Sequence, residues 1–262
     1  MIKPSLRIAV LECDEPIGRT KEKYGGYGNL FKELLNNGAK RVAEQDDDVE
    51  LGLDVTKYDV VKHEVYPDLE NIDAVLLTGS RESTLTIQAK VKADQRSLML
   101  VEFTKMVLSQ QRVLLIGVCF GHQIIGRAMG VKVALSDRGW EVSVTPVQLT
   151  AKGKDLFKVD ELAIHQMHRD IVYEFPKGVE SLGHSPRCDV QGMYIKHRLI
   201  TVQGHPEFTG DIVAELLDSR HERGIFDDAM YEDGMKRVRQ PHDGIAVGAA
   251  FIRFLLERLR SA

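Results

Sequence analysis

One cysteine has the flanking residues of a catalytic nucleophile. The stretch VLLIGVCFGHQ places an apolar run before Cys119 and glycines two residues to either side, at Gly117 and Gly121. A strand that turns sharply into a helix exposes the side chain at the turn, and only small residues fit beside it. A thiol at a helix N-terminus also feels the positive end of the helix dipole, which favours the thiolate. The pattern predicts a nucleophile at Cys119, whereas Cys13 and Cys188 are expected to be core residues.

A cysteine nucleophile needs a base, and one of the nine histidines has a suggestive position. The apolar run 199–203 predicts a strand, and Gly-His-Pro-Glu follows it, with His205 and Glu207 two residues apart. An imidazole at the end of a strand can reach a nucleophile on a neighbouring strand. The Glu207 carboxylate could then accept from the other ring nitrogen and fix the tautomer. On spacing alone this pairing stays a hypothesis, because so short a pattern carries little information.

The elements that must position these residues follow an α/β pattern. Short apolar runs alternate with amphipathic stretches, as in parallel strands that helices cover on both faces. We expect one domain over residues 1–262: a mostly parallel sheet flanked by helices, a small antiparallel extension, and a C-terminal helical extension from about residue 210. The expected strands are Leu6–Leu11, Ile72–Leu77, Val113–Ile116, Trp140–Leu149, Val179–His184 and Leu199–Gln203. The expected helices are Gly28–Asn36, Asp94–Leu108, Ile124–Met129, Ile212–Arg223 and Gly244–Leu259.

Composition narrows the classes of function. The 262 residues carry 35 Lys and Arg against 39 Asp and Glu, and a net charge of -4 argues against a general nucleic-acid binder. The hydrophobic share of 43% is that of a globular protein, and no run approaches the roughly 20 apolar residues of a membrane span. Three widely spaced cysteines predict no disulfide framework. With an N-terminus that lacks a signal-peptide pattern, these features predict a cytoplasmic protein.

Taken together, the two motifs resemble those of the class I glutamine amidotransferases. Gly-Val-Cys-Phe-Gly-His-Gln at 117–123 and Gly-His-Pro-Glu at 204–207 carry the resemblance, which extends over about residues 6–215. The branch that fits has stand-alone members in fungi and plants, whose domains are similar to the amidotransferase part of GMP synthetase. The resemblance implies a flavodoxin-like α/β fold with no metal and no cofactor.

The resemblance also implies a triad. Cys119 would be the nucleophile, His205 the general base and then the acid, and Glu207 the carboxylate that orients the imidazole. In this family the cysteine attacks a γ-glutamyl carbonyl to give a thioester, which releases ammonia when the donor is glutamine. Water then hydrolyses the thioester to glutamate, so one difficult amide hydrolysis becomes two easier steps.

Further residues match the substrate site of that family. An oxyanion hole would use the backbone N–H of Phe120 and an N–H of the loop at Gly79 and Ser80. Gln123 matches a position that helps to hold the glutamate portion of the substrate, although an ordinary helix residue is the alternative. His168 lies in HQMHRD, which resembles a segment that lines the glutamine pocket, and a polar turn is its alternative.

Three functions are consistent with the sequence. No ATP-binding loop or synthetase domain accompanies the motifs, so ammonia from glutamine would need an acceptor enzyme on another chain. The second hypothesis is a free-standing γ-glutamyl peptidase that acts on glutathione-type peptides. The third is a scaffold or regulator without catalysis. The first two share a small-molecule substrate and the Cys119 thioester, and they require neither nucleic acid nor membrane.

Overall fold

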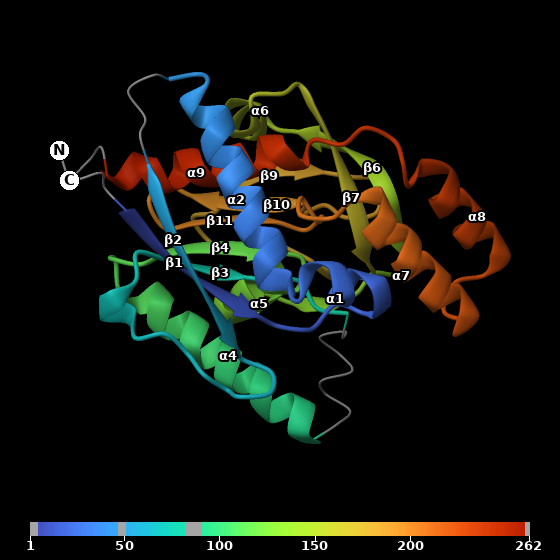
Figure 1. Ribbon diagram of the computed structural model, residues 1–262, viewed down its shortest axis with the longest axis horizontal. Coiled ribbons are helices and arrows are strands. Elements are labelled where there is room, and N and C mark those ends of the chain that lie inside the picture. The colour runs from blue at the N-terminus through green and yellow to red at the C-terminus, as the bar shows by residue number, and fades with distance from the viewer. Residues whose placement is uncertain (1–4, 47–50, 82–90, 260–262) are drawn as a thin grey trace.

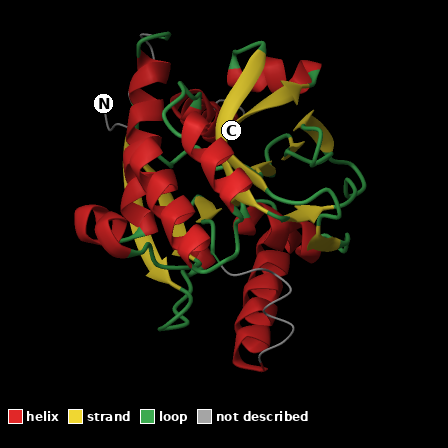
Figure 2. Ribbon diagram, turned by 90° about the vertical axis from the view of Figure 1, so that its right-hand side faces the viewer, coloured by secondary structure: helices red, strands yellow, loops and turns green. Residues whose placement is uncertain are grey.

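Strands and helices alternate along the chain, and helices lie on both faces of the main sheet (Figures 1 and 2). The structure is a computed structural model that describes residues 5–46, 51–81 and 91–259. The strands are β1 (Ser5–Glu12), β2 (Gly52–Asp59), β3 (Ala74–Leu77), β4 (Leu114–Val118), β5 (Val133–Leu135), β6 (Glu141–Leu149), β7 (Glu161–His168), β8 (Asp170–Val172), β9 (Glu180–His184), β10 (Gly192–Ile195) and β11 (Leu199–Val202). The helices are α1 (Gly18–Tyr24), α2 (Tyr27–Ala43), the 3-10 helix η1 (Leu69–Asn71), α4 (Val91–Ser109), α5 (Phe120–Ala128), α6 (Ala151–Phe157), α7 (Gly210–Glu222), α8 (Asp228–Arg237) and α9 (Gly244–Leu259).

The parallel part of the sheet brings the candidate residues to one edge. Its strand order is β2-β1-β3-β4-β11, and each neighbouring pair is parallel. The carboxyl ends of β3, β4 and β11 therefore lie side by side, and the chain continues from them to Gly79, Cys119 and His205. In open α/β sheets, ligands bind outside the carboxyl ends of the strands. This edge of the sheet is where a site is expected.

An antiparallel extension continues the same sheet through β10, β9, β6 and β7. The predicted α/β class is confirmed, but the extension is larger than expected because β7 and β10 were not predicted as strands. In β7, polar residues such as His165 and Gln166 are buried, so the strand has neither an apolar run nor a polar outer face. Strands β5 and β8 form a separate antiparallel pair.

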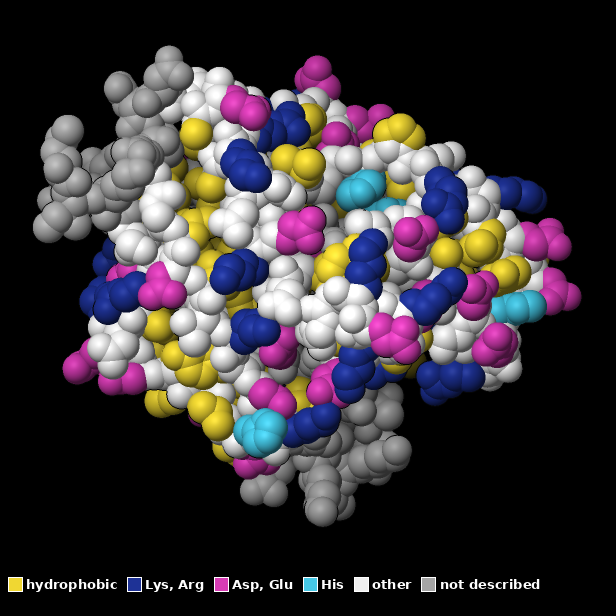
Figure 3. Space-filling view, in the orientation of Figure 1, with side chains coloured by type: hydrophobic (Ala, Val, Ile, Leu, Met, Phe, Trp, Pro, Cys, Tyr) yellow, Lys and Arg dark blue, Asp and Glu magenta, His cyan; other side chains and the backbone are white. Residues whose placement is uncertain are grey.

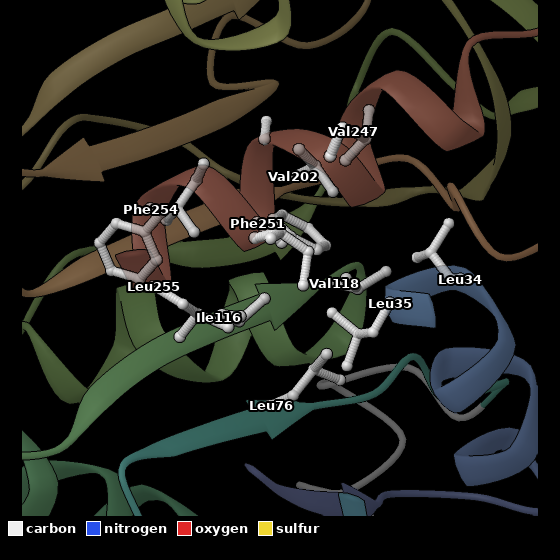
Figure 4. Close-up of a cluster of buried hydrophobic side chains, with 14 of the residues drawn as sticks. Leu34, Leu35, Leu76, Ile116, Val118, Val202, Val247, Phe251, Phe254 and Leu255 are labelled. Carbon is white, nitrogen blue, oxygen red and sulfur yellow. The ribbon is translucent and has the colours of Figure 1, made fainter. Parts of the chain in front are cut away.

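Apolar layers fix the helices on the two faces of the sheet. On one face, Figure 4 shows Phe251 and Val247 of α9 over Ile116 and Val118 of β4, with Leu35 of α2 beside them. Helices α4 and α5 cover the other face. Burial of one such apolar side chain stabilises the fold by about 1.5–3 kcal/mol. The strand that precedes Cys119 is thus held from both sides.

The chain after residue 210 forms helices over the antiparallel part and the core. Helix α7 packs with α8, α8 lies against β6, and α9 packs on α2. Figure 3 shows Lys and Arg side chains interspersed with Asp and Glu on the face in view. No helix in the part of the chain that the structure describes is long and apolar enough to cross a membrane.

Candidate active site

Cys119 lies at a sharp turn between β4 and α5, as the sequence predicts. Its backbone has φ 51° and ψ -103°, a conformation that costs a residue with a Cβ about 1–3 kcal/mol. The turn is tied to both neighbouring strands. The Cys119 N–H donates to the Val202 carbonyl of β11 at 2.9 Å, and the Gly121 N–H donates to the Thr78 carbonyl after β3 at 3.2 Å. The surroundings therefore hold the cysteine in its strained conformation.

The two flanking glycines allow α5 to approach the sheet closely. A Cβ on Gly121 would lie 2.3 Å from the backbone oxygen of Leu77, and a Cβ on Gly117 would lie 2.7 Å from Cδ1 of Ile125. The first of these contacts is with backbone, which moves only if α5 shifts as a whole. The sequence predicts that only small residues fit at these two positions, and the structure shows that a larger side chain would clash with Leu77 or Ile125.

His205 and Glu207 are both buried and in direct contact. His205 Nδ1 lies 2.8 Å from Glu207 Oε1. The backbone N–H of His205 donates to the His165 carbonyl of β7 at 2.7 Å, and its ring stacks on Phe208 with centroids 4.0 Å apart and planes 3° from parallel. Both the position and the plane of the imidazole are therefore fixed. With Nδ1 occupied, Nε2 is the ring nitrogen left for Cys119.

The imidazole and the cysteine meet in front of Gly79. A Cβ on Gly79 would lie 2.6 Å from His205 Cε1 and 3.6 Å from Cys119 Cβ, so only glycine fits there. Burial lowers the pKa of His205, but the neighbouring Cys119 and Glu207 outweigh burial and raise this pKa to about 10. His205 is consequently protonated at neutral pH. An imidazolium next to a thiol favours the thiolate, the nucleophilic form of sulfur.

A pocket opens beside Cys119, with an empty volume of about 390 Å³ that includes its open mouth. Four of the predicted site residues line it: Ser80, Cys119, Gln123 and His168. The predicted residues Gly79 and Phe120 are not among its lining residues, although Gly79 lies against Cys119 and His205. Its lining residues are Ser80, Arg81, Cys119, Gln123, Leu135, Trp140, Met167, His168, Arg169, Asp170 and Arg220.

Comparison with models of protein families shows which family the chain belongs to. The model of the class-I glutamine amidotransferases matches residues 34–216. The chain belongs to this family. A glutamine amidotransferase-like protein of Schizosaccharomyces pombe is 34% identical over 255 residues, which are 95% of this chain and 98% of the relative. Gamma-glutamyl peptidase 2 of Arabidopsis thaliana is 29% identical over 247 residues, covering 92% of this chain and 91% of the relative.

Solved structures of the class I family share the fold. A glutamine amidotransferase of Thermotoga maritima superposes with a TM-score of 0.60 over 95% of this chain and 98% of that chain, at 16% identity. A glutamine amidotransferase of Methylobacillus flagellatus gives 0.62 over 97% and 96%, at 17% identity. The family acts on small-molecule glutamine or γ-glutamyl substrates, which suits a pocket of this kind.

In this member of the class I family, Gln123 and His168 line the pocket while making internal contacts. Gln123 Nε2 donates to the Asp170 carbonyl at 2.8 Å and to Gln203 Oε1 at 3.1 Å. His168 Nδ1 lies 3.2 Å from the Asp170 carbonyl, and His168 Nε2 lies 3.0 Å from Glu141 Oε2. Both residues hold the segment between β7 and β8 at the pocket. Their direct contact with a substrate stays a prediction.

Sequence reasoning assigned no role to Glu141, a buried carboxylate behind the pocket. Glu141 accepts from Ser185 Oγ at 2.6 Å and from Gln191 Nε2 at 2.8 Å, besides its contact with His168. Burial raises the pKa of Glu141, but His168 and Ser185 outweigh burial and hold it below its usual range. The ionised carboxylate thus positions His168. In the sequence, Trp140–Glu141–Val142 resembles a family segment that leads towards the pocket, but no local pattern marks Glu141 as the partner of His168.

Arg220 of α7 is the second missed residue of the pocket. Its guanidinium carbon lies 4.7 Å from the Trp140 ring centroid. The spacing of apolar residues in the helix could have indicated that Arg220 is buried. Ile212 and Leu216 precede it at intervals of four, so Arg220 continues the buried stripe of the helix.

Two other buried histidines near the site are unsuited to act as the base. Burial and the neighbouring His168 lower the pKa of His122 to about 3, and its Nδ1 contacts Thr201 Oγ1 at 2.7 Å. Burial and the neighbouring His242 lower the pKa of His165 to about 3 as well. A pKa near 3 makes both imidazoles weak bases at physiological pH. His205 differs from them because it faces Glu207 and Cys119.

We expect Glu207→Gln to lower the pKa of His205 and to reduce kcat roughly 10²-fold. The variant removes one of the negative charges that raise this pKa, and a Gln amide can donate to Nδ1 and stabilise the wrong tautomer. The pKa is measured from the pH dependence of the His205 Cε1–H resonance. The raised pKa of His205 stabilises the folded state: this contribution is complete below pH 6.5 and disappears as the pH rises towards 10. In Glu207→Gln the contribution should disappear at a lower pH, because the pKa of His205 is lower.

The matched control for this experiment is Glu161→Gln, which removes an exposed carboxylate at the start of β7. It should leave both the His205 titration and kcat unchanged within twofold. A His205 titration that is the same in Glu207→Gln and in the unmodified protein would contradict the assigned role of Glu207.

Proposed function

We propose that the protein hydrolyses a γ-glutamyl amide through a thioester on Cys119. The observation that carries the proposal is the arrangement of Cys119 on a strained turn, facing an imidazole that a buried carboxylate orients at 2.8 Å. Membership in the class I family supports it, since this is the arrangement that cysteine-dependent acyl transfer needs.

The reaction starts from the His205 imidazolium beside the Cys119 thiolate, since His205 already carries the proton at neutral pH. The sulfur then attacks the γ-carbonyl carbon, and the carbonyl oxygen becomes an oxyanion. Phe120 is the first residue of α5, where a backbone N–H has no acceptor within the helix. We propose that this amide and an N–H of the loop at Gly79 and Ser80 bind the oxyanion. Losing one such donor typically reduces the rate roughly 10²- to 10³-fold.

In the second half, the oxyanion collapses and the C–N bond breaks. The His205 imidazolium gives its proton to the departing nitrogen, which leaves as ammonia from glutamine or as an amine from a γ-glutamyl peptide. Water then attacks the thioester while His205 accepts its proton, glutamate departs, and the Cys119 thiolate beside the His205 imidazolium is restored. Glu207 accepts from Nδ1 throughout and stabilises the imidazolium.

Two donors satisfy this chemistry. With glutamine, the product ammonia would pass to an acceptor enzyme on another chain, and the amidotransferase-like relative in Schizosaccharomyces pombe supports this version. With γ-glutamyl peptides the protein would work alone, and the relative named gamma-glutamyl peptidase 2, which matches over 92% of this chain, supports that version. Both versions share Cys119, His205 and Glu207.

A donor screen tests the proposed function. We expect glutamate release from γ-linked donors, namely glutamine, γ-glutamyl-glycine and glutathione, because the reacting carbonyl is the side-chain one. The α-linked peptide α-glutamyl-glycine is the matched control and should release none above background. The ratio of kcat/KM between glutamine and the peptides then identifies the working donor. Release from no γ-linked donor, with or without cell extract, would contradict the proposal.

A further inference from the structure

Arg220 is a buried cation without a carboxylate partner. The residue is 8% exposed, and its Nη1 is buried with no hydrogen-bond partner. Within the described ranges, no Asp or Glu oxygen lies within ion-pair distance of it. Buried charges are normally paired, because an unpaired one loses its hydration without compensation. The donor groups of Arg220 thus remain for a group that comes from outside the chain.

Aromatic rings, rather than acidic groups, hold the guanidinium in place. Its central carbon lies 4.7 Å from the Trp140 ring centroid and 5.6 Å from that of Phe226. These two rings pack edge to face, with centroids 5.2 Å apart. A ring face stabilises a cation without using its N–H donors. Although burial lowers the pKa of Arg220 to about 10, the side chain is still charged at neutral pH.

The cation lines the same pocket as the nucleophile. Arg220, Trp140, Cys119 and His168 all line the pocket beside the turn. Arg81 also lines it, but its guanidinium is held by Asp14, with Nε 3.0 Å from Oδ2. Any molecule that brings a carbonyl to Cys119 in this pocket therefore comes close to a buried guanidinium.

The geometry points to Arg220 as the residue that binds a carboxylate of the acyl donor. A guanidinium presents paired N–H donors that match the two oxygens of a carboxylate. The inference rests on the proposed function, because γ-glutamyl donors supply this group. All of them carry the α-carboxylate of the glutamyl part, and γ-glutamyl peptides carry a second one on the leaving group. Arg220 would thus contribute to donor selection rather than to bond breaking.

Binding to an inactivated protein tests the inference without requiring turnover. In a Cys119→Ala background, calorimetry compares γ-glutamyl-glycine with γ-glutamyl ethylamide, which lacks the carboxylate on the leaving group. We expect Arg220→Met to weaken binding of γ-glutamyl-glycine at least tenfold. An equal loss for both ligands assigns Arg220 to the α-carboxylate, and a loss confined to γ-glutamyl-glycine assigns it to the leaving group. Binding within twofold of the Cys119→Ala protein for both ligands would overturn the inference.

Two further variants separate recognition from folding. Arg223→Met removes the same charge from an exposed site at the end of α7 and should leave both affinities unchanged within twofold. Arg220→Lys keeps the charge but lacks the paired donors, and should bind more weakly than Arg and more tightly than Met. If Arg220→Met does not fold, a Lys variant that binds as well as Arg would overturn the inference.

Failure of the proposed function gives a different result. If the unmodified protein releases glutamate from no donor while Arg220→Met still abolishes binding, the carboxylate site stands and the hydrolysis does not. In active protein, the same substitution should raise KM more than it lowers kcat, because Arg220 contacts the donor away from the reacting bond.

Discussion

Cys119→Ala is expected to reduce glutamate release roughly 10⁵-fold or more while leaving the fold intact. Without the sulfur no thioester forms, and only the remaining binding and oxyanion groups act on the substrate. The substitution removes one atom from a residue whose strained backbone is held by Val202, so the melting temperature should change little. Steady-state kinetics and thermal unfolding measure the two effects. Cys119→Ser should also fail, because an alkoxide forms far less readily than a thiolate.

Cys13→Ala and Cys188→Ala are the matched controls, since each removes another buried thiol. Burial raises the pKa of Cys13 to about 12 and raises the pKa of Cys188 as well, so both stay protonated at neutral pH. Neither variant should change kcat by more than about twofold. Folded Cys119→Ala protein with full activity would show that the nucleophile lies elsewhere.

His205→Gln is expected to reduce kcat roughly 10⁴-fold. The variant loses the group that gives a proton to the departing nitrogen and accepts one from the attacking water. It also loses the imidazolium beside the sulfur, so alkylation of Cys119 by iodoacetamide at pH 7 should become slower. The two measurements together distinguish a lost base from a misfolded site.

The control for this variant is His184→Gln, an exposed histidine at the end of β9. It should alter neither kcat nor the alkylation rate beyond about twofold. If His205→Gln retained full activity, one of the other histidines would have to be the base, although a pKa of about 3 makes His122 and His165 weak bases.

Local patterns account for the elements that the sequence predicted correctly. The predicted helix 244–259 coincides with α9, because Val247 and Phe251 repeat at helical spacing on its buried face. The turn at Cys119 was predictable because its glycines lie within two residues of it. By contrast, β7 was missed, since its buried polar residues satisfy no local pattern for a strand.

From the sequence, site residues could be predicted only where they lie within short motifs. His205 meets Cys119 because β11 pairs with β4 across 80 residues of chain, and the motifs alone do not specify this pairing. The roles of Glu141 and Arg220 were not predicted, for the same reason. Their burial depends on His168 and Trp140, which come from other elements and approach them only in the folded chain.

The most direct measurement of the central claim is covalent labelling with diazo-oxo-norleucine, a glutamine analogue that alkylates a thiolate held at the γ-carbonyl position. Mass spectrometry of the digested protein should find one adduct, on the peptide that contains Cys119, and excess glutamate should slow its formation. In His205→Gln the labelling should be slower, and in Cys119→Ala it should be absent. Labelling of Cys13 or Cys188 instead, or turnover that continues while Cys119 is fully alkylated, would contradict the account.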